Sequence, residues 1–279
     1  MEKFIKKTLL WCFLFLSLMV TITLVVINHY KDYYGLVKKA KHTTFLLADS
    51  HGLRINLENI GVDNLSYGSN SYVDIKNQLS WLVKNKDFDR VILTYDEQMF
   101  SSYRDNLNNN HLSYFLNPIP ISAFRANFIV KYCAVFKKLI SSGTIKLVFQ
   151  SRGNFKSSKK ESVDTLEEGD RINKAKNRIE LQFKEKSLVQ ENAFNDILGI
   201  CKKNNIEVIL IKFPLSQTYI NERAKNKNYK ALKEIINPLL NLDLSISISD
   251  DRFYRDEDHL NEDGISILEK LISDSIDKP

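Results

Sequence analysis

The stretch TTFLLADSHG, residues 43–52, joins a short apolar run to a turn of polar residues and glycine. An aliphatic and β-branched run of this length, bounded by turn-forming residues, predicts a buried β-strand. Three other runs share this apolar, β-branched character: Arg90–Thr94, Ile145–Phe149 and Ile206–Phe213. A fourth run, Leu244–Ser249, shows it more weakly. We therefore expect a five-stranded sheet that begins with residues 43–48.

Longer segments with helical periodicity separate these runs. They are Tyr72–Lys86, Ser122–Ser141, Asn192–Asn204 and Asn228–Leu240. Short apolar strands that alternate with helices are typical of βαβ units, in which helices cover a parallel sheet. The sequence therefore predicts an α/β domain with a mostly parallel five-stranded sheet over residues 43–279. Ligands of such sheets bind beyond the carboxyl ends of the strands, so functional residues are expected in the loops that follow them.

One polar segment breaks this alternation. Residues 151–176 are rich in Ser, Lys and Glu and show no apolar periodicity, which predicts an insertion or a mobile flap. The adjoining stretch Asp170–Lys186 is highly charged and favours a solvated helix face. The basic stretch Lys156–Lys160 is either a solvated charge run or a surface for an anionic glycan or lipid headgroup.

The composition is that of an ordinary globular protein. Of 279 residues, 43% are hydrophobic and 27% are charged, which argues against disordered, collagen-like and multi-span membrane classes. The 40 basic and 34 acidic residues are interleaved along the chain. We expect no nucleic-acid partner, because proteins that bind nucleic acid gather their basic residues into a patch or stripe.

The cysteines and histidines give no metal-ligand pattern. Cys12, Cys133 and Cys201 lie far apart, without a CxxC or Cys/His pair, which excludes a disulfide scaffold. A single bridge between Cys133 and Cys201 and two buried free thiols both remain open. The histidines are scattered, so the sequence predicts no metal site and no other cofactor.

An uncharged apolar segment, TLLWCFLFLSLMVTITLVVI at residues 8–27, lies near the amino terminus. It has the length of roughly 20 residues that a helix needs to cross the hydrocarbon core of a bilayer. A cleaved signal peptide is the alternative, but Asn28-His29-Tyr30 follows instead of a small-residue cleavage site. We predict an uncleaved anchor that binds the lipid bilayer through residues 8–27.

Lysines on both sides of this segment bear on its orientation. Lys3, Lys6 and Lys7 precede it, whereas further lysines between residues 31 and 41 weaken the charge asymmetry. We favour a cytoplasmic tail at residues 1–7, a linker at residues 28–42 and an extracytoplasmic domain that follows. The predicted location is the cell inner (cytoplasmic) membrane, crossed once.

The first predicted strand leads into a serine, Ser50. A serine at the turn between a buried strand and the next helix can expose its Oγ and present its own N–H to a ligand, as a nucleophile requires. Turn formation or helix capping by Asp49 and Ser50 is the alternative. His51 is a minor alternative as a base, because adjacent side chains rarely converge on one acceptor.

A second polar motif, DEDHLNEDG at residues 256–264, lies immediately before the amphipathic run Ile265–Ile276. A histidine three residues after an aspartate can donate to that carboxylate from one ring nitrogen while the other nitrogen faces a serine. This interpretation makes the histidine a base and the aspartate its orienter. The alternative is a structural histidine in a loop where Asn261 and Asp263 cap the helix.

Together the two motifs resemble the SGNH (GDSL-like) hydrolase superfamily. ADSHG resembles its first block, normally Gly-Asp-Ser, and DEDHLNEDG resembles its last block, Asp-x-x-His followed by Leu-Asn-x-x-Gly. The resemblance extends over nearly all of residues 43–276, including NIEVILIKFP at residues 205–214. It implies a three-layer flavodoxin-like fold, with Ser50 as nucleophile, His259 as general base and Asp256 as the residue that orients the base.

The middle blocks of the family match less well. Gly68 stands where the family has a glycine whose N–H donates to the oxyanion, although an ordinary turn glycine is equally open. After the third strand the family has Gly-x-Asn-Asp, whereas this chain reads TYDEQ at residues 94–98, so the asparagine is missing. The amide of Gln98 or the hydroxyl of Tyr95 could replace it. Losing one oxyanion donor costs on the order of a hundredfold or more in rate.

The anchor and the domain together resemble membrane-anchored SGNH-like proteins of bacterial envelope polysaccharide modification. These are similar in plan to alginate O-acetylation and teichoic acid D-alanylation proteins. The resemblance implies a serine esterase or O-acyltransferase that acts on an envelope polysaccharide or acylated glycan through an acyl-serine. The alternatives are a weak or inactive relative that binds glycan or positions a membrane-bound acyltransferase, and an unrelated α/β signalling or assembly domain.

Overall fold

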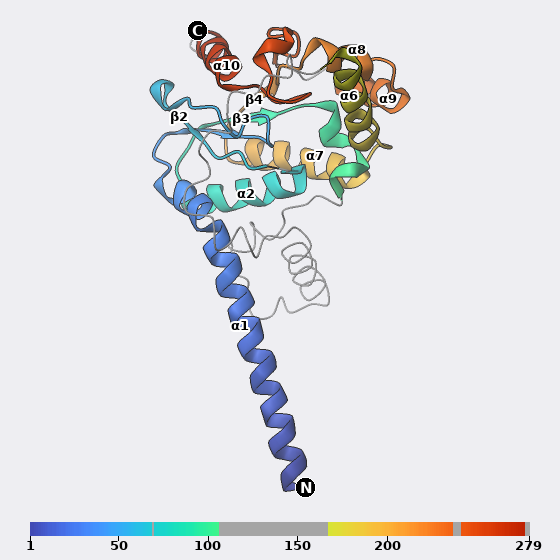
Figure 1. Ribbon diagram of the computed structural model, residues 1–279. Coiled ribbons are helices and arrows are strands. Elements are labelled where there is room, and N and C mark those ends of the chain that lie inside the picture. The colour runs from blue at the N-terminus through green and yellow to red at the C-terminus, as the bar shows by residue number, and fades with distance from the viewer. Residues whose placement is uncertain (69, 106–166, 237–240, 277–279) are drawn as a thin grey trace. The chain divides into compact units, whose positions relative to one another are not determined.

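The structure is a computed structural model that describes residues 1–68, 70–105, 167–236 and 241–276. The described chain divides into two compact units (Figure 1). One holds residues 1–39, and the other begins at Ala40 and holds the rest of the described residues.

Within the described residues, the first unit consists of the helix α1, Glu2–Lys39 (Figure 1). Its described apolar side chains are exposed, with Trp11 at 70% and Phe13 at 68%. No helix in the described part of the chain combines the length and the apolarity needed to cross a membrane. The side chains at residues 19 and 22–38 lie outside the described part, so the anchor predicted at residues 8–27 falls partly outside it.

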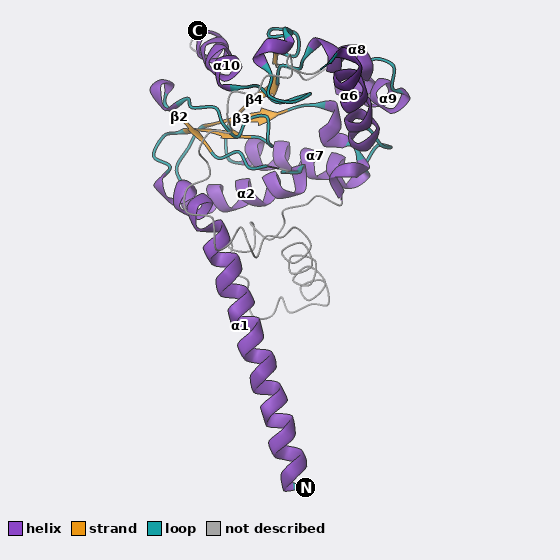
Figure 2. Ribbon diagram, viewed as in Figure 1, coloured by secondary structure: helices purple, strands orange, loops and turns teal. Residues whose placement is uncertain are grey.

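The second unit is built around a five-stranded sheet (Figure 2). Its strands are, in chain order, β1 Thr44–Leu47, β2 Val62–Asn64, β3 Arg90–Thr94, β4 Glu207–Lys212 and β5 Leu242–Asp243. They pair in the order β2-β1-β3-β4-β5, and every pairing is parallel. The predicted α/β class with a mostly parallel five-stranded sheet is therefore confirmed. This strand order is also the one found in flavodoxin-like sheets.

Helices and short 3₁₀ turns connect the strands. The helices are α2 Tyr72–Asn85, α6 Glu168–Gln182, α7 Leu188–Lys203, α8 Gln217–Arg223, α9 Lys227–Ile236 and α10 Glu262–Ile276. The 3₁₀ turns are η1 Glu58–Ile60, η2 Glu97–Phe100, η3 Ser102–Asp105 and η6 Asp251–Phe253. These connections carry each strand to the next in the same direction, as parallel pairing requires.

Helices pack on both faces of the sheet (Figure 1). α2 and α7 contact each other on one face. On the other face, Leu268 and Ile272 of α10 join Leu46, Ile92 and Ile211 of the sheet in one buried cluster. Because successive strand residues point to opposite faces, β1 and β3 are covered on both sides. This explains why their sequences are apolar runs without alternation.

The start of α2 shows how local sequence fixes an element. Ser71 Oγ accepts a hydrogen bond from the Asp74 N–H at 3.3 Å, and the Asp74 carboxylate accepts one from the Ser71 N–H at 3.0 Å. This reciprocal capping box begins the helix. Ile75, Leu79 and Leu82 follow at helical spacing and are buried. The predicted helix is confirmed here except at its last residue.

Two strand predictions need comment. Leu244–Ser249 is not a strand, because β5 lies just before it and the segment turns: the Ser247 N–H and Oγ–H both donate to the Leu244 carbonyl, at 3.0 and 2.8 Å. The alternation LSISIS imitates a strand in sequence alone. No strand is predicted at β2, because its three residues are too few for a periodic pattern. The strand predicted at Ile145–Phe149 lies outside the described residues.

The helix predictions are confirmed where the structure describes them. α7 begins earlier than the predicted Asn192, at Leu188, because Ser187 Oγ accepts from the Gln190 N–H at 3.2 Å and caps the helix. α9 and α10 correspond to the other two predicted segments in the carboxyl-terminal third. The helix predicted at Ser122–Ser141 lies outside the described residues.

The last part of the insertion predicted at residues 151–176 is helical. Residues 168–176 belong to α6, whereas residues 151–166 lie outside the described part. Within α6 the buried residues are Ala175, Ile179 and Gln182. This stripe is too narrow to give a clear apolar pattern. The other charged side chains of α6 form the solvated helix face that the sequence predicts, except that Arg171 and Arg178 are partly buried and pair with Asp251 and Asp258.

Gly264 fixes the start of α10 against the loop before it. A Cβ here would lie 2.4 Å from the Phe253 carbonyl oxygen and 2.8 Å from Leu260 Cδ2. Gly264→Ala is therefore expected to lower the free energy of unfolding by about 2 kcal/mol, as overpacking does. The matched control is Gly199→Ala in α7, where no atom lies within 4 Å of the added Cβ and alanine favours the helix. Urea denaturation measures both; equal stability of the two variants would contradict the clash.

Candidate active site

Ser50 lies in the turn that follows β1, at the carboxyl edge of the sheet. The Gly52 N–H donates to the Asp49 carbonyl at 3.2 Å and closes the turn. A Cβ on residue 52 would lie 2.6 Å from Ala48 Cβ and 2.7 Å from Ser66 Oγ, so a glycine is needed there. The turn therefore holds a half-buried Ser50 at the end of an interior strand, where parallel sheets bind ligands.

His259 comes from the loop between η6 and α10. The Arg255 N–H donates to the His259 carbonyl at 3.0 Å and closes this loop. At its far end, Asn261 Oδ1 accepts from the Gly264 N–H at 3.0 Å, which is the helix-capping role expected of Asn261. The imidazole is buried, with 8% of the residue exposed. Loop closure and helix cap together fix the position of the ring.

The two segments bring together the three residues expected to form a triad. The Ser50 hydroxyl lies 2.8 Å from His259 Nε2, in position to donate to it. His259 Nδ1 lies 2.8 Å from Asp256 Oδ1, and the same oxygen accepts from the His259 backbone N–H at 2.9 Å. A hydroxyl, an imidazole and a carboxylate linked in this order have the geometry of nucleophile, general base and orienter.

A second carboxylate, which the sequence interpretation misses, also faces the base. Asp258 Oδ1 lies 2.9 Å from His259 Nδ1, and Asp258 is 1% exposed. Arg178 Nε donates to Asp258 at 2.9 Å and Gln182 Nε2 donates to it at 3.1 Å. Arg178 and Gln182 stand four residues apart on α6, so they share one helix face. The spacing of four residues between Arg178 and Gln182 is the sequence feature that could have indicated this role, although it lies in a stretch expected to be solvated.

The pKa values of these groups reflect mutual stabilisation of opposite charges. Burial disfavours the charged form of His259, but Asp258 and Asp256 outweigh it and raise the pKa of the imidazole. Burial would likewise raise the pKa of both carboxyls, yet interaction with His259 dominates, so the pKa of Asp256 is lowered and that of Asp258 is lowered well below its usual value. The site therefore favours an imidazolium held between two carboxylates.

The raised pKa of His259 predicts the pH dependence of acylation at Ser50. His259 accepts the serine proton only when it is neutral, so kcat/KM should rise with pH through the pKa of His259 and then level off. The acid limb is expected above 6.5, the ordinary histidine value. Initial rates with a p-nitrophenyl ester between about pH 5 and about pH 9 locate the limb. A limb below the ordinary histidine value would contradict this electrostatic arrangement.

Asp49 and His51, the residues on either side of Ser50, also contact charged or aromatic groups. Asp49 is fully buried and accepts from the Arg104 guanidinium, and its Oδ1 lies 2.9 Å from His51 Nδ1. Burial would raise the pKa of Asp49, but His51 and Arg104 outweigh it and hold the pKa well below its usual range. The ring of His51 stacks on that of His259, with centroids 4.9 Å apart and planes at 12°. Ser50 Oγ pairs with His259, which argues against His51 as the base.

Gly68, an expected oxyanion donor, lies in the loop after β2. This loop is tied to the end of β1, because the Tyr67 N–H donates to the Ala48 carbonyl at 3.1 Å and Asn70 Nδ2 donates to the same oxygen at 3.2 Å. A Cβ on Gly68 would meet no atom within 4 Å, so a substrate could approach the backbone there. Ser50 itself makes no backbone N–H hydrogen bond to any described residue.

The other two expected donors differ in placement. Gln98, in η2 beyond β3, has its side-chain nitrogen 3.4 Å from His51 Nδ1 and so lies beside the paired histidines. Tyr95 is 1% exposed, and its ring packs against Phe194 and Phe100 with centroid distances of 5.2 and 5.8 Å. Among the described residues, Tyr95 forms no hydrogen bond with Ser50 or the base. Gln98 is therefore the better placed of the two.

The carboxyl-terminal edge beyond β3 contains further buried charges. Asp96 is 5% exposed and accepts from Thr94 Oγ1 at 3.2 Å; burial raises its pKa to about 6. Glu97 is fully buried between Lys212, which donates to it, and Arg223, whose Nη1 lies 3.5 Å away. These paired charges anchor η2, which carries Gln98, to β4 and α8.

Asp258 and His259 of the site are already engaged within the protein. Among the described residues, His51, Asp258 and His259 each place one possible metal ligand within 4.8 Å of the others. However, the Arg178 guanidinium neutralises Asp258, and His259 Nε2 pairs with Ser50. This arrangement is typical of a hydrogen-bonded acid–base site, and it does not leave the open coordination positions typical of a catalytic metal.

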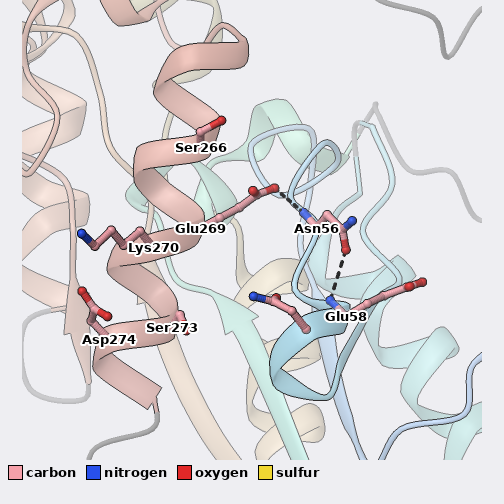
Figure 3. A pocket seen from close by; sticks show the side chains of 8 residues that line it. Asn56, Glu58, Ser266, Glu269, Lys270, Ser273 and Asp274 are labelled. Carbon is pink, nitrogen blue, oxygen red and sulfur yellow. Dashed lines mark hydrogen bonds between the residues drawn. The ribbon is translucent and has the colours of Figure 1, made fainter.

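A polar pocket lies elsewhere, between the η1 segment and α10 (Figure 3). Its volume is about 440 Å³, and it is lined by Asn56, Glu58, Asn59, Ser266, Glu269, Lys270, Ser273 and Asp274. Figure 3 shows Glu269 reaching across to Asn56, whose N–H donates to it at 2.6 Å. None of the triad residues lines this pocket, so it is separate from the Ser50 edge.

The sequence matches no model of a known protein family and no curated protein.

Proposed function

We propose that the domain is a serine esterase or O-acyltransferase of the SGNH (GDSL-like) type. The observation that carries the proposal is the hydrogen-bonded chain from Ser50 Oγ through His259 to Asp256, with each link at 2.8 Å. The order of Ser50 and Asp256-x-x-His259 along the chain, and the three-layer flavodoxin-like plan that the strand order suggests, support the same superfamily.

The proposed reaction begins with proton transfer. His259 Nε2 takes the proton of Ser50 Oγ as the oxygen attacks the ester carbonyl carbon, and the carbonyl becomes a tetrahedral oxyanion. The intermediate collapses, the C–O bond to the leaving alcohol breaks, and the alcohol takes the proton from His259. The acyl group is then bound to Ser50. The carboxylates of Asp256 and Asp258 stabilise the imidazolium that exists between the two proton transfers.

In the second half His259 activates the acceptor. It removes a proton from water or from a sugar hydroxyl, whose oxygen attacks the acyl-serine, and the proton returns to Ser50 Oγ as the enzyme ester breaks. Water gives a free carboxylic acid, and a sugar hydroxyl gives a new ester. Hydrolase and transferase therefore use the same residues and differ in which acceptor reaches the acyl-serine.

The oxyanion requires donors at the same edge. The N–H groups of Ser50 and Gly68 are proposed for this role, with the Gln98 amide in place of the missing asparagine. Each preorganised donor contributes on the order of a hundredfold or more in rate. If Gln98 cannot reach the oxyanion, turnover would be correspondingly slow.

The proposed substrate is an acylated envelope polysaccharide, handled at the outer face of the cytoplasmic membrane. The support is the uncharged apolar run at residues 8–27, which would anchor the domain to the bilayer. A reporter phosphatase fused after Pro279 should be active only if the domain lies outside the cytoplasm. A fusion that is produced at a normal level but has no phosphatase activity would contradict this topology.

A direct test uses the purified full-length chain in detergent. It should hydrolyse a short-chain aryl ester and, when an acetylated polysaccharide is supplied, release acetate or transfer acetyl to an added oligosaccharide.

The missing asparagine favours a second candidate, a glycan-binding relative that positions a membrane-bound acyltransferase. Retention of the protein on immobilised polysaccharide with no ester turnover would favour that candidate and count against catalysis.

A further inference from the structure

Side chains of alternating charge form a line next to the proposed triad. Arg104 donates to Asp49, Asp49 Oδ1 lies 2.9 Å from His51 Nδ1, and His51 Nε2 lies 3.6 Å from Asp258 Oδ2. Arg178 pairs with the other end, at 2.9 Å from Asp258. The line therefore joins the turn that carries Ser50 to the loop that carries His259 through the ring of His51.

We propose that His51 is a positioning residue that stays protonated between Asp49 and Asp258. The ring of His51 stacks on that of His259, and its positive charge limits how strongly His259, the general base, holds a proton. The proposal rests on the proposed function, since it concerns how the same site is tuned. His51 does not touch the reacting atoms; it acts through Asp258 and His259.

The surroundings of His51 favour the charged form. His51 Nδ1 faces Asp49 Oδ1 at 2.9 Å, and Nε2 faces Asp258 Oδ2 at 3.6 Å, just beyond hydrogen-bond reach. A carboxylate can only accept hydrogen bonds, so both contacts favour a proton on the nitrogen. Both carboxylate side chains have no exposed surface, and the His51 side chain is 4% exposed. Burial opposes the charge of the imidazole, but the two carboxylates outweigh it and raise the pKa of His51 well above its ordinary value.

The ring of His51 is surrounded by groups from several elements. Besides Asp49 on its own turn and Asp258 on the carboxyl-terminal loop, Gln98 of η2 lies 3.4 Å from Nδ1 and Phe213 lies beyond β4 with its ring centroid 6.3 Å away. Asp96, which follows β3, also interacts with His51, and this interaction lowers the pKa of Asp96 against the effect of burial. His259 is the group that faces His51 across the stack.

The stacked charge opposes the effect of the two carboxylates on the base. Asp258 and Asp256 raise the pKa of His259, whereas His51 lowers it. Without His51, only burial and the Arg178 guanidinium, whose Nη2 lies 3.3 Å from His259 Nδ1, would offset the carboxylates, and His259 would stay protonated to higher pH. A protonated His259 cannot accept the Ser50 proton, so the neutral fraction of the base at a given pH depends on the charge of its neighbour.

A single proton fits this place better than a divalent metal. The fully buried carboxylates Asp49 and Asp258 already have the guanidiniums of Arg104 and Arg178 as partners. A proton on His51 adds one positive charge between these two carboxylates. A dication would add two beside two guanidiniums and would displace the Ser50 hydrogen bond if it bound His259 Nε2.

The test uses the full-length protein with isotope-labelled histidine, followed by NMR from about pH 5 to about pH 9, a range that covers ordinary histidine titration. The chain has five histidines, and substitution of each assigns its signal. In the wild type, His51 should show the shifts of an imidazolium at neutral pH and titrate well above 6.5. In His51→Gln, the titration of His259 should move to higher pH.

The kinetic result should follow the titration. With a p-nitrophenyl ester, the acid limb of kcat/KM in His51→Gln is expected to move to higher pH, with a loss of about tenfold on the acid side and less than about threefold on the alkaline plateau. His42→Gln is the matched control, because His42 also pairs with a carboxylate, Asp63 at 3.1 Å, but does not contact the triad. Its profile should match the wild type.

Two results would overturn the proposal. One is a neutral His51 at pH 7 in the wild type, which needs no variant and is therefore independent of whether His51→Gln folds. The other is a folded His51→Gln in which the His259 titration does not move. Failure of the proposed function is a different outcome: Ser50 would not react with an ester or a fluorophosphonate, whatever the protonation state of His51.

Discussion

Ser50→Ala is expected to lower ester turnover by at least about 10⁴-fold, because the hydroxyl is the atom that attacks and no other group can take its place in the chain of hydrogen bonds. The loss should appear in kcat, since the substrate-binding groups remain. Ser50 is half-buried and its hydroxyl bonds to one partner, His259, so the fold should be retained. Steady-state rates with a p-nitrophenyl ester, together with a thermal melt, measure both properties.

A serine that serves only local structure provides the control. Ser80 lies on α2, where its hydroxyl donates to the carbonyl of Lys76 at 2.8 Å. Ser80→Ala should leave turnover within about twofold of the wild type, as surface substitutions usually do. A Ser50→Ala variant that keeps more than about a tenth of wild-type turnover would show that another residue is the nucleophile.

Asp258→Asn is expected to reduce the free energy of unfolding by about 3 kcal/mol and to reduce turnover as well. The substitution removes the nearer of the two carboxylates that pair with Arg178, since Glu257 Oε2 lies 3.8 Å from Nη1. It also removes a counter-charge from His51, in a region where Asp258 has no exposed surface. The estimate is at the low end of the range for buried ion pairs because Arg178 is 32% exposed.

The effect should depend on pH in a defined direction. The pKa of Asp258 is lowered in the folded protein, so its contribution to stability is present above the ordinary carboxyl value of 3.8 and is lost as the pH falls through the lowered value. The difference between wild type and Asp258→Asn should therefore be largest near neutrality and shrink in acid. Urea denaturation at several pH values measures it.

Asp256→Asn is the matched variant, because it changes the other carboxylate at the same imidazole nitrogen. The Asp256 side chain is 34% exposed, so the loss of stability should be below about 1 kcal/mol although turnover falls. If Asp258→Asn were as stable as Asp256→Asn, Asp258 would not be the buried anchor described here.

The sequence predicts local structure correctly where a single local pattern is strong. The run at residues 43–48 is apolar because β1 is covered on both faces, and the polar residues after it mark the end of the strand. Asn261 and Gly264 follow His259 in a pattern that begins a helix, which places the histidine in a closed loop. These local features place Ser50 at the end of a strand and His259 in a loop before a helix. That the two residues pair is what the resemblance to the SGNH (GDSL-like) superfamily implies.

Features that depend on contacts between distant segments could not be predicted in this way. Arg178 reaches Asp258 from a helix whose sequence is mostly charged, and only the folded arrangement shows that one face of this helix supports the site. The stacking of His51 on His259 likewise joins residues 208 positions apart in the chain. The short strand β2 and the turn at residues 244–249 were not predicted, because the conformation of a brief segment depends more on the elements it packs against than on its own residue types.

The most direct test of the central claim is the site of covalent labelling by a fluorophosphonate on the full-length protein, read by mass spectrometry of its peptides. The expected result is one label per chain at Ser50, formed at a rate that falls sharply in a folded His259→Gln variant. A stoichiometric label on another residue, or a folded wild-type protein in which Ser50 stays unlabelled, would contradict the assignment of nucleophile and base.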